Sequence, residues 1–243
     1  MRAALSLLSR RWQALALLLL AGCAARPLPP QPAAAPPAPL AQPSPAPKAP
    51  SSVRFGDGLL DQFELQVQGG HCLLRWRGEF PADAVPALGQ ALSELEQHRC
   101  TRKTLALDLR GGDIGPATTL GAMLRNRQFD TELLPGSRCQ TPCALVFAAG
   151  RQRLMPEDGH QAQLLLSQVR RDQDFGQAVC ETELNRGQQL TLTRYLRAML
   201  PPATAAVVYQ KISRATCRRH DILDASEALA TGLATGMLPA SLR

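Results

Sequence analysis

The sequence predicts a single α/β domain that occupies most of the 243-residue chain. Two stretches support this fold class, because in each an apolar strand runs into a loop marked by glycine or proline and then into a helix. The first is TLALDLRGGDIG, residues 104–115, and the second is DTELLPGSRCQTPCALVFAAG, residues 130–150. In α/β proteins such loops at strand ends are common places for binding sites and chemistry.

The elements before the first of these loops follow the same logic. Residues 63–67 alternate apolar and polar side chains, residues 71–77 do so less regularly, and the glycine pair 69–70 between them predicts a hairpin. Residues 85–95 place valine or leucine at steps of three and four, which is typical of an amphipathic helix. That helix would return the chain to a parallel strand at 104–109.

The later elements repeat the order of strand, loop and helix. The segment 142–149 is apolar on all sides, so we expect its helix to be buried. We expect further helices at 120–124, 189–200 and 203–215, strands at 130–134 and 162–169, a solvated connection at 151–158, and a short helix with a final edge segment at 221–236.

The N-terminus has the pattern of a lipoprotein signal peptide over residues 1–22. Arg2, Arg10 and Arg11 precede an apolar run at residues 14–20, and the sequence LAGC ends at Cys23. A membrane-spanning helix would need roughly 20 apolar residues, and the run is too short for that. We therefore expect Cys23 to carry the lipid. Ala24 follows it, which by the rule for Gram-negative lipoproteins favours the periplasmic face of the outer membrane.

Residues 23–51 follow as a tether between the lipid and the domain at 52–243. Eleven of the chain's 20 prolines lie in residues 26–50 among alanines, where no apolar pattern could build a core. A proline-rich recognition segment is the alternative interpretation of this stretch. Removal of the signal peptide lowers the formal net charge from +7 to +4. This small excess gives no reason to expect a nucleic-acid partner.

The two loops resemble those of the Clp protease proteolytic subunit and its crotonase-like superfamily, in particular the bacterial periplasmic ClpP-like branch. The resemblance covers about residues 63–236 and implies a ClpP/crotonase-like ββα spiral. It implies that Gly111 and Gly112 form an oxyanion hole. In that branch a nucleophilic serine stands in a pattern like C-x-S-A-C-A, and this chain has CQTPCA at residues 139–144, with Thr141 at the serine position.

Thr141 has two interpretations. Its hydroxyl makes it a candidate nucleophile, whereas a threonine followed by Pro142 is also an ordinary helix start, with the threonine as N-cap. The base position of the branch lies in a motif like G-V-H-Q-F, and the matching residues 165–169 are LLSQV. Ser167 thus replaces the histidine and cannot act as a base near neutral pH. His160, in the preceding loop, is the candidate substitute.

The third catalytic position of the branch, normally aspartate, falls near Arg218, with Asp221 and Asp224 close by. Because all three roles depart from the pattern, we expect a non-catalytic pseudo-protease that binds a peptide or a periplasmic protein. Extended peptides would bind by strand addition beside the glycine loop, which needs backbone groups and no catalytic triad. The alternative is an atypical peptidase or esterase with Thr141 as nucleophile. An acyl-CoA enzyme of the crotonase type is disfavoured, because coenzyme A is not expected in the periplasm.

No cofactor or metal is expected, and the resemblance leaves homo-oligomer formation open. Six cysteines remain besides Cys23, and an even number in an exported chain favours disulfides over a zinc site, because no C-x-x-C spacing occurs. Six cysteines allow many pairings. Sequence order and the superfamily layout imply Cys72 with Cys100 and Cys180 with Cys217, which leaves Cys139 and Cys143 for each other.

Overall fold

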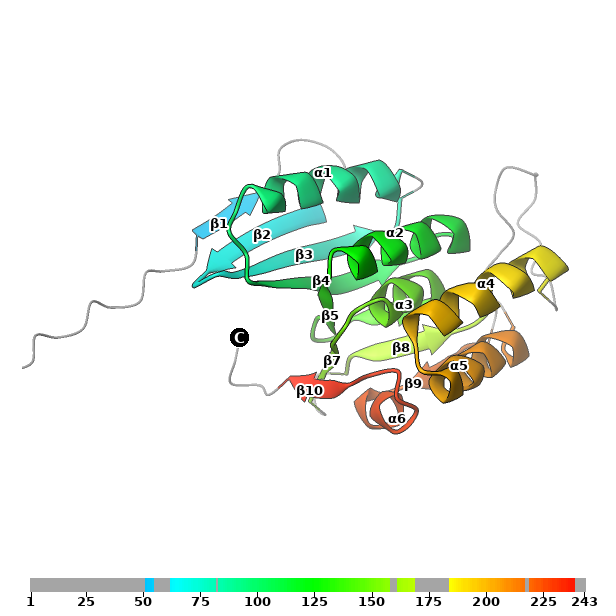
Figure 1. The fold of residues 1–243 in the computed structure, drawn as a ribbon. Coiled ribbons are helices and arrows are strands. Elements are labelled where there is room, and N and C mark those ends of the chain that lie inside the picture. Colours follow the sequence, from blue (N-terminus) through cyan, green and yellow to red (C-terminus); the bar gives the residue numbers. More distant parts are fainter. Residues whose placement is uncertain are drawn as a thin grey trace, which may run out of the picture. The chain divides into compact units, whose positions relative to one another are not determined.

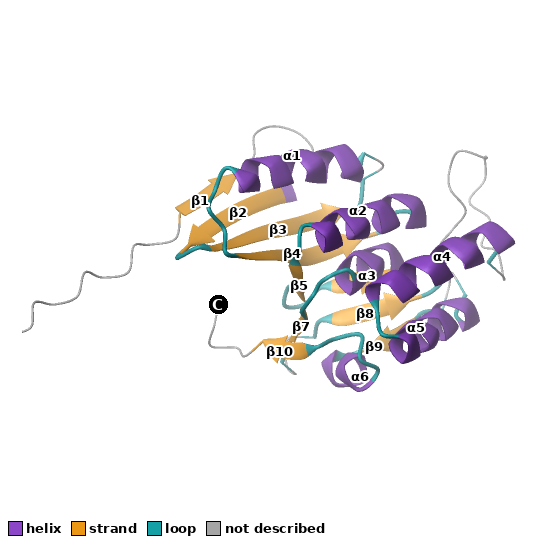
Figure 2. Cartoon of the chain, viewed as in Figure 1, coloured by secondary structure: helices purple, strands orange, loops and turns teal. Residues whose placement is uncertain are grey.

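The computed structural model describes residues 51–54 (backbone only), 62–81, 83–157, 161–168, 184–216 and 219–238. They form a mixed α/β fold with two sheets, which confirms the predicted fold class (Figures 1 and 2). The strands are β1 (Ser51–Arg54), β2 (Phe63–Gln68), β3 (His71–Glu79), β4 (Arg102–Arg110), β5 (Asp130–Leu133), β6 (Arg138–Gln140), β7 (Arg153–Pro156), β8 (Gln163–Leu166), β9 (Asp221–Leu223) and β10 (Gly236–Leu238). The helices are α1 (Ala84–Glu96), α2 (Ile114–Asn126), α3 (Thr141–Ala148), α4 (Arg186–Met199), α5 (Pro202–Arg214) and α6 (Ala225–Ala230).

The larger sheet has the strand order β1-β2-β3-β4-β5-β7-β10. The first three strands are antiparallel, and the strands from β3 to β10 pair in parallel. Gly69 and Gly70 join β2 to β3 with φ of 55° and 83°, as the predicted hairpin requires. Helices α1 and α2 make the crossovers from β3 to β4 and from β4 to β5. Helix α1 begins one residue before the predicted range 85–95, whereas α2 begins at Ile114, six residues before the predicted range 120–124.

The smaller sheet has the order β6-β8-β9. Strand β6 is parallel to β8, and β9 is antiparallel to it. The sequence analysis predicted β8 but neither of its neighbours. Strands β6 and β9 have three residues each, which is too short to show an alternating pattern. Strand β6 bears on the candidate site, because it follows the Pro135-Gly136 turn of the second loop and leads directly into α3.

The prediction of a solvated connection at 151–158 is wrong in its central part. Strand β7 lies inside the larger sheet, between β5 and β10. Arg153, its first residue, is only 5% exposed. The guanidinium group donates to the carbonyl oxygens of Leu233 at 2.7 Å, Gly150 at 3.1 Å and Gly232 at 3.2 Å. These three acceptors allow a charged residue to occupy an interior strand.

An aromatic stack connects the core to the glycine loop. Trp76 and Phe63 stack with ring centroids 4.8 Å apart, and Phe80 lies 5.4 Å from Trp76. All three side chains are buried. Helix α3 is also buried over its whole length, as its apolar sequence predicts. The two loops are therefore held on a closely packed base.

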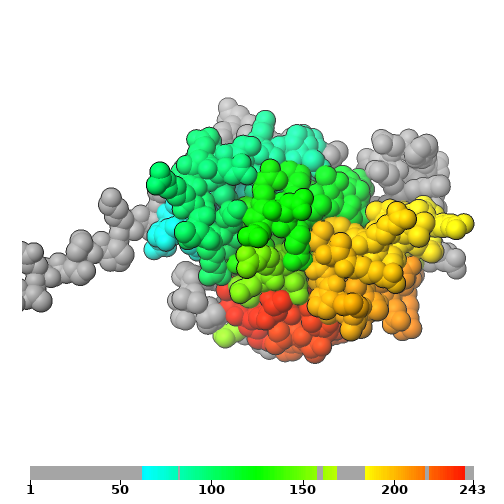
Figure 3. All heavy atoms as spheres, viewed as in Figure 1, coloured from blue at the N-terminus to red at the C-terminus, as the bar shows by residue number. Residues whose placement is uncertain are grey.

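Helix α4 packs against α2 and α3, and Figure 3 shows the atoms of α2 (green) and α4 (yellow) next to each other. A side-chain carbon on Gly121 of α2 would lie 1.7 Å from the Tyr195 hydroxyl of α4, so glycine is required there. Tyr195 donates to the carbonyl oxygen of Leu145 in α3 at 2.6 Å. Burial raises the pKa of Tyr195. Among the described residues, no helix combines the length and apolar character needed to cross a membrane.

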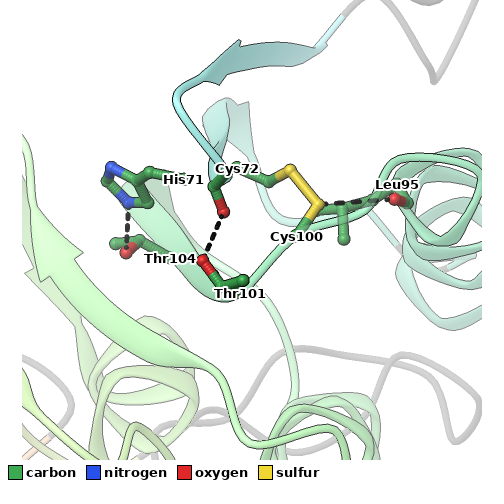
Figure 4. Close-up of a disulfide and its surroundings, with 7 residues drawn as sticks. His71, Cys72, Leu95, Cys100, Thr101 and Thr104 are labelled. Atoms are coloured by element: carbon green, nitrogen blue, oxygen red, sulfur yellow. Dashed lines mark hydrogen bonds between the residues drawn. A yellow bond between two sulfur atoms is a disulfide. The ribbon is translucent and has the colours of Figure 1, made fainter.

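Two disulfides lie in the described part of the chain. Cys72 bonds to Cys100 with Cα atoms 5.6 Å apart, and this bond ties β3 to the segment after α1 (Figure 4). Cys139 bonds to Cys143 with Cα atoms 5.2 Å apart, across the start of α3. These are two of the three expected pairs. Cys180 and Cys217 lie outside the described residues.

Candidate functional site

The first glycine loop leaves β4 with two residues in the left-handed region. Gly111 has φ of 70° and Gly112 has φ of 96°. A side-chain carbon on Gly112 would lie 2.5 Å from Cγ of Phe80, so no larger residue fits there. The loop thus needs glycine for its backbone conformation and for its close approach to the aromatic core.

The main-chain N–H of Gly111 already has an acceptor. It donates to the carboxamide oxygen Oε1 of Gln140 at 2.9 Å. Gln140 is the half-buried last residue of β6, and it stands 29 positions further along the chain. Gln140 was not predicted as a site residue, because nothing local in the sequence signals a contact over that distance. An expected oxyanion-hole donor is therefore occupied by the protein itself.

A second oxyanion donor is missing next to Thr141. In α/β-hydrolases the residue after the nucleophile commonly supplies a main-chain N–H to the oxyanion. Here that residue is Pro142, which has no N–H group. Pro142 is visible in the sequence, but it was interpreted only as a helix start, so its missing N–H group was not predicted to matter.

The structure places Thr141 in a buried position with a structural contact. Its side chain is 1% exposed. The hydroxyl donates to the carbonyl oxygen of Ser167 at 2.7 Å and accepts from the N–H of Ser167 at 2.8 Å. The expected N-cap role of Thr141 is wrong. The helix counts Thr141 as its first residue, the N-cap is Gln140, and no side chain caps this end of α3. Instead, the threonine joins α3 to the end of β8.

The structure therefore brings together Thr141 and Ser167, the residues expected at the nucleophile and base positions. They meet through the main chain of Ser167 and not through an acid–base pair. His160 and Arg218, the other residues expected near these roles, lie outside the described residues.

Asp221 and Asp224 have partners of their own. Asp221 accepts from the ammonium group of Lys211 at 2.8 Å. Asp224 caps α6, where its carboxylate accepts from the N–H of Glu227 at 2.8 Å. Both carboxylates thus have structural roles, Asp221 between β9 and α5 and Asp224 at the start of α6. Neither contact involves Thr141.

A groove of about 500 Å³ opens where β6 and β8 begin, at the opposite end of these strands from Thr141. Its polar lining includes Arg138, Glu157 and Gln163, and Asp224 borders it. Arg138 and Gln163 are the first residues of their strands, so the groove is separated from Thr141 by the length of β6. No group of three or more metal-ligating side chains occurs in the part of the chain that the structure describes.

No model of a known protein family matches the sequence, and no curated protein matches it either. Among solved structures, a mutant of 1510-N, a membrane-bound stomatin-specific protease, is similar with a TM-score of 0.52 and 13% identity, over 68% of this chain and 77% of that chain. Another mutant of the same protease, in complex with a substrate peptide, has a TM-score of 0.53 and 13% identity, over 68% of this chain and 73% of that chain. At this identity the likeness concerns the fold and not the chemistry. The domain has the α/β fold of the ClpP/crotonase-like proteins.

Proposed function

We propose that this protein is a periplasmic lipoprotein, anchored through Cys23 to the outer membrane, whose ClpP-like domain is a non-catalytic pseudo-protease that binds a peptide or protein partner. The observation that carries the proposal is the double hydrogen bond between the Thr141 hydroxyl and the main chain of Ser167.

A nucleophilic hydroxyl needs a base to take its proton and free space for the substrate carbonyl. The Thr141 proton instead points to a carbonyl oxygen, and that oxygen cannot accept it in a proton transfer. With 1% exposure, the hydroxyl is also closed to an incoming carbonyl. Attack by Thr141 would leave the N–H and C=O groups of Ser167 without their partner in a buried place.

The oxyanion side of the site supports the same conclusion. Pro142 offers no N–H group, and the N–H of Gly111 is held by Gln140. Loss of a single oxyanion donor lowers kcat of a hydrolase by about 100- to 1000-fold. A site that lacks one donor and covers another is poorly suited to stabilise a tetrahedral intermediate.

Peptide binding is favoured by what the site retains. The glycine loop keeps its left-handed backbone and its place at the end of a parallel strand. Peptides can bind such backbones through main-chain hydrogen bonds without any catalytic residue. A neighbour of the same fold has been solved with a substrate peptide bound. From this neighbour we take only that the fold can hold a peptide, and not the hydrolysis.

The anchoring rests on the sequence of residues 1–51. The charged start, the apolar run and LAGC agree with lipidation of Cys23, and the proline-rich stretch after it suits a tether. Metabolic labelling with an alkyne fatty acid in a Gram-negative host tests this part. We expect the label on the wild-type protein in the outer-membrane fraction, on Ala33→Ser in the tether as the control, and not on Cys23→Ser. Label retained by Cys23→Ser would contradict the anchor.

A fluorophosphonate probe and a panel of peptide and ester substrates test the absence of catalysis. We expect no labelling and no turnover from the wild type, from Thr141→Ala, or from Thr119→Ala, an exposed threonine on α2 that serves as control. Activity present in the wild type and in Thr119→Ala but lost in Thr141→Ala would overturn the proposal. It would support the alternative of a threonine hydrolase, and His160→Ala would then test the base.

Site-specific photo-crosslinking tests the binding. Glu79 lies beside the glycine loop with its side chain 70% exposed, whereas Glu96 ends α1 with its side chain 57% exposed. A photoreactive phenylalanine analogue is placed at position 79, and at position 96 as the control. We expect a periplasmic partner to be captured from position 79 only. Equal capture from both positions, or none from position 79, would contradict a binding site at this loop.

A further inference from the structure

The contact between Gly111 and Gln140 shows what kind of ligand this donor accepts. The Gln140 oxygen is an amide carbonyl, chemically equivalent to the carbonyl of a peptide main chain. It lies 2.9 Å from the Gly111 nitrogen, at ordinary hydrogen-bond distance. The N–H group is therefore oriented to receive an amide oxygen.

The main chain around Gln140 is held on both sides. The preceding residue, Cys139, is bonded to Cys143. The side chain of the following residue, Thr141, is hydrogen-bonded to the main chain of Ser167. Gln140 itself pairs with Leu165 in the register of β6 and β8. The glutamine side chain is half-buried, so it lies partly at the surface. It can leave Gly111 by rotation about its own bonds, without any change in the backbone.

The charges beside the donor favour a neutral ligand. The Glu79 carboxylate lies next to the loop, with Oε2 3.4 Å from the place of a side-chain carbon on Gly111. Its other oxygen is 3.5 Å from Nε of Arg110, and both of these side chains are exposed, so the ion pair is weak. Because the guanidinium and the carboxylate offset each other, this border has no net positive charge to hold an anionic ligand, whereas a neutral carbonyl needs only the N–H donor.

We propose that Gln140 is an internal gate of the peptide site: its carboxamide oxygen holds the N–H of Gly111 until a main-chain carbonyl of an extended peptide displaces it. The inference rests on the proposed function, because it assigns the regulation and the ligand chemistry of the same loop. The gate exchanges one amide acceptor for another and leaves the donor paired in both states.

The gate lowers the apparent affinity for the peptide, because the open form is only a fraction of the population. An intramolecular hydrogen bond of ordinary net strength corresponds to about a three- to ten-fold effect on an equilibrium. Removing the carboxamide should therefore tighten peptide binding by about three- to ten-fold.

The amide resonance of Gly111 in the 15N-labelled full-length protein provides the test. Gln140→Ala removes the carboxamide, and Gln140→Asn keeps it on a chain one methylene shorter. Gln97→Ala, an exposed glutamine after α1, is the matched control. Without ligand, we expect the Gly111 amide to exchange faster with solvent in both Gln140 variants than in the wild type and Gln97→Ala. The probe ligand is acetyl-tetra-alanine amide, and acetate is the anionic comparison.

On titration with the peptide, we expect the Gly111 resonance to shift in all four proteins, with about three- to ten-fold tighter binding in the two Gln140 variants. Acetate should not shift it. Unchanged Gly111 exchange in both variants, or equal peptide affinity in all four proteins, would overturn the gate while peptide binding stood. A shift caused by acetate and not by the peptide would overturn the ligand assignment. No binding of this peptide to any of the four would overturn the gate, whereas the proposed function is decided separately by the photo-crosslinking from position 79.

Discussion

The hydroxyl of Thr141 donates to the main-chain oxygen of Ser167 at 2.7 Å and accepts from its main-chain nitrogen at 2.8 Å. The resemblance to ClpP-like hydrolases predicts the nucleophile at the first of these residues and the base at the second. The same two positions are thus in contact, but the contact stabilises the junction of α3 with β8.

Thr141→Val should lower the free energy of unfolding by about 1–3 kcal/mol, because it keeps the shape of the side chain and leaves the two main-chain groups of Ser167 unpaired in a buried place. Thr141→Ser keeps the hydroxyl and should be the milder change. Urea unfolding of the two variants and the wild type measures the difference. A stability of Thr141→Val equal to that of the wild type would mean that the hydroxyl has no structural role.

Arg153→Met should destabilise the protein by at least about 2 kcal/mol, because three carbonyl oxygens lose a charged donor. Burial and the nearby Arg125 lower the pKa of Arg153 to about 10, so the group remains charged at neutral pH. The exposed Arg151 is the matched control, and Arg151→Met should stay within about 0.5 kcal/mol of the wild type. Two of the three carbonyls belong to the segment between α6 and β10. Protease cleavage near the C-terminus should therefore become faster in Arg153→Met, and an unchanged cleavage rate would contradict the anchoring of this segment.

The two described disulfides should differ in their contribution to stability. The Cys72–Cys100 bond joins residues 28 apart, whereas Cys139 and Cys143 are 4 apart. On the chain-entropy account, the longer loop contributes about 3.6 kcal/mol and the shorter one about 2 kcal/mol. Replacing each pair by alanines and comparing urea midpoints tests the order. If loss of Cys139–Cys143 proved the more harmful, the bond would act mainly by holding the folded junction of β6 and α3.

His71 should make the folded state less stable in mild acid. Its ring nitrogen Nε2 lies 2.9 Å from the hydroxyl of the buried Thr104 (Figure 4). Burial and the nearby Arg102 lower the pKa of His71, and Asp130 opposes this shift. Because the folded state binds the proton less tightly than the unfolded chain, stability is full above the ordinary histidine pKa of about 6.5 and decreases as the pH falls below it.

His71→Gln removes this titration and keeps a polar side chain. Between pH 7.5 and pH 5, the free energy of unfolding should decrease less in the variant than in the wild type. Parallel curves for the two proteins would show that the proton on His71 does not affect folding.

The local pattern of the sequence was enough to predict the hairpin at Gly69 and Gly70, the succession of strands and helices, the buried helix α3 and the glycine loop after β4. These features depend on the period of apolar residues and on glycine, and both are visible within a few neighbouring positions. Pro142 was equally visible, and its missing N–H group could have been used. The lipid anchor at Cys23 and the tether after it remain predictions of the sequence.

The tertiary structure alone decided the state of the site. Its hydrogen bonds join residues far apart in the sequence: Gly111 and Gln140 are 29 positions apart, Thr141 and Ser167 are 26 apart, and Arg153 and Leu233 are 80 apart. Strands β6 and β9 are equally non-local, because three residues show no period and pair only where the packing of α3 and α6 brings them to β8. A hydrogen bond between distant residues depends on the register and packing of whole elements, and no local pattern encodes it. For this reason the sequence indicates which residue types stand at the nucleophile and oxyanion positions, whereas only the folded chain shows that their donors and acceptors are already paired.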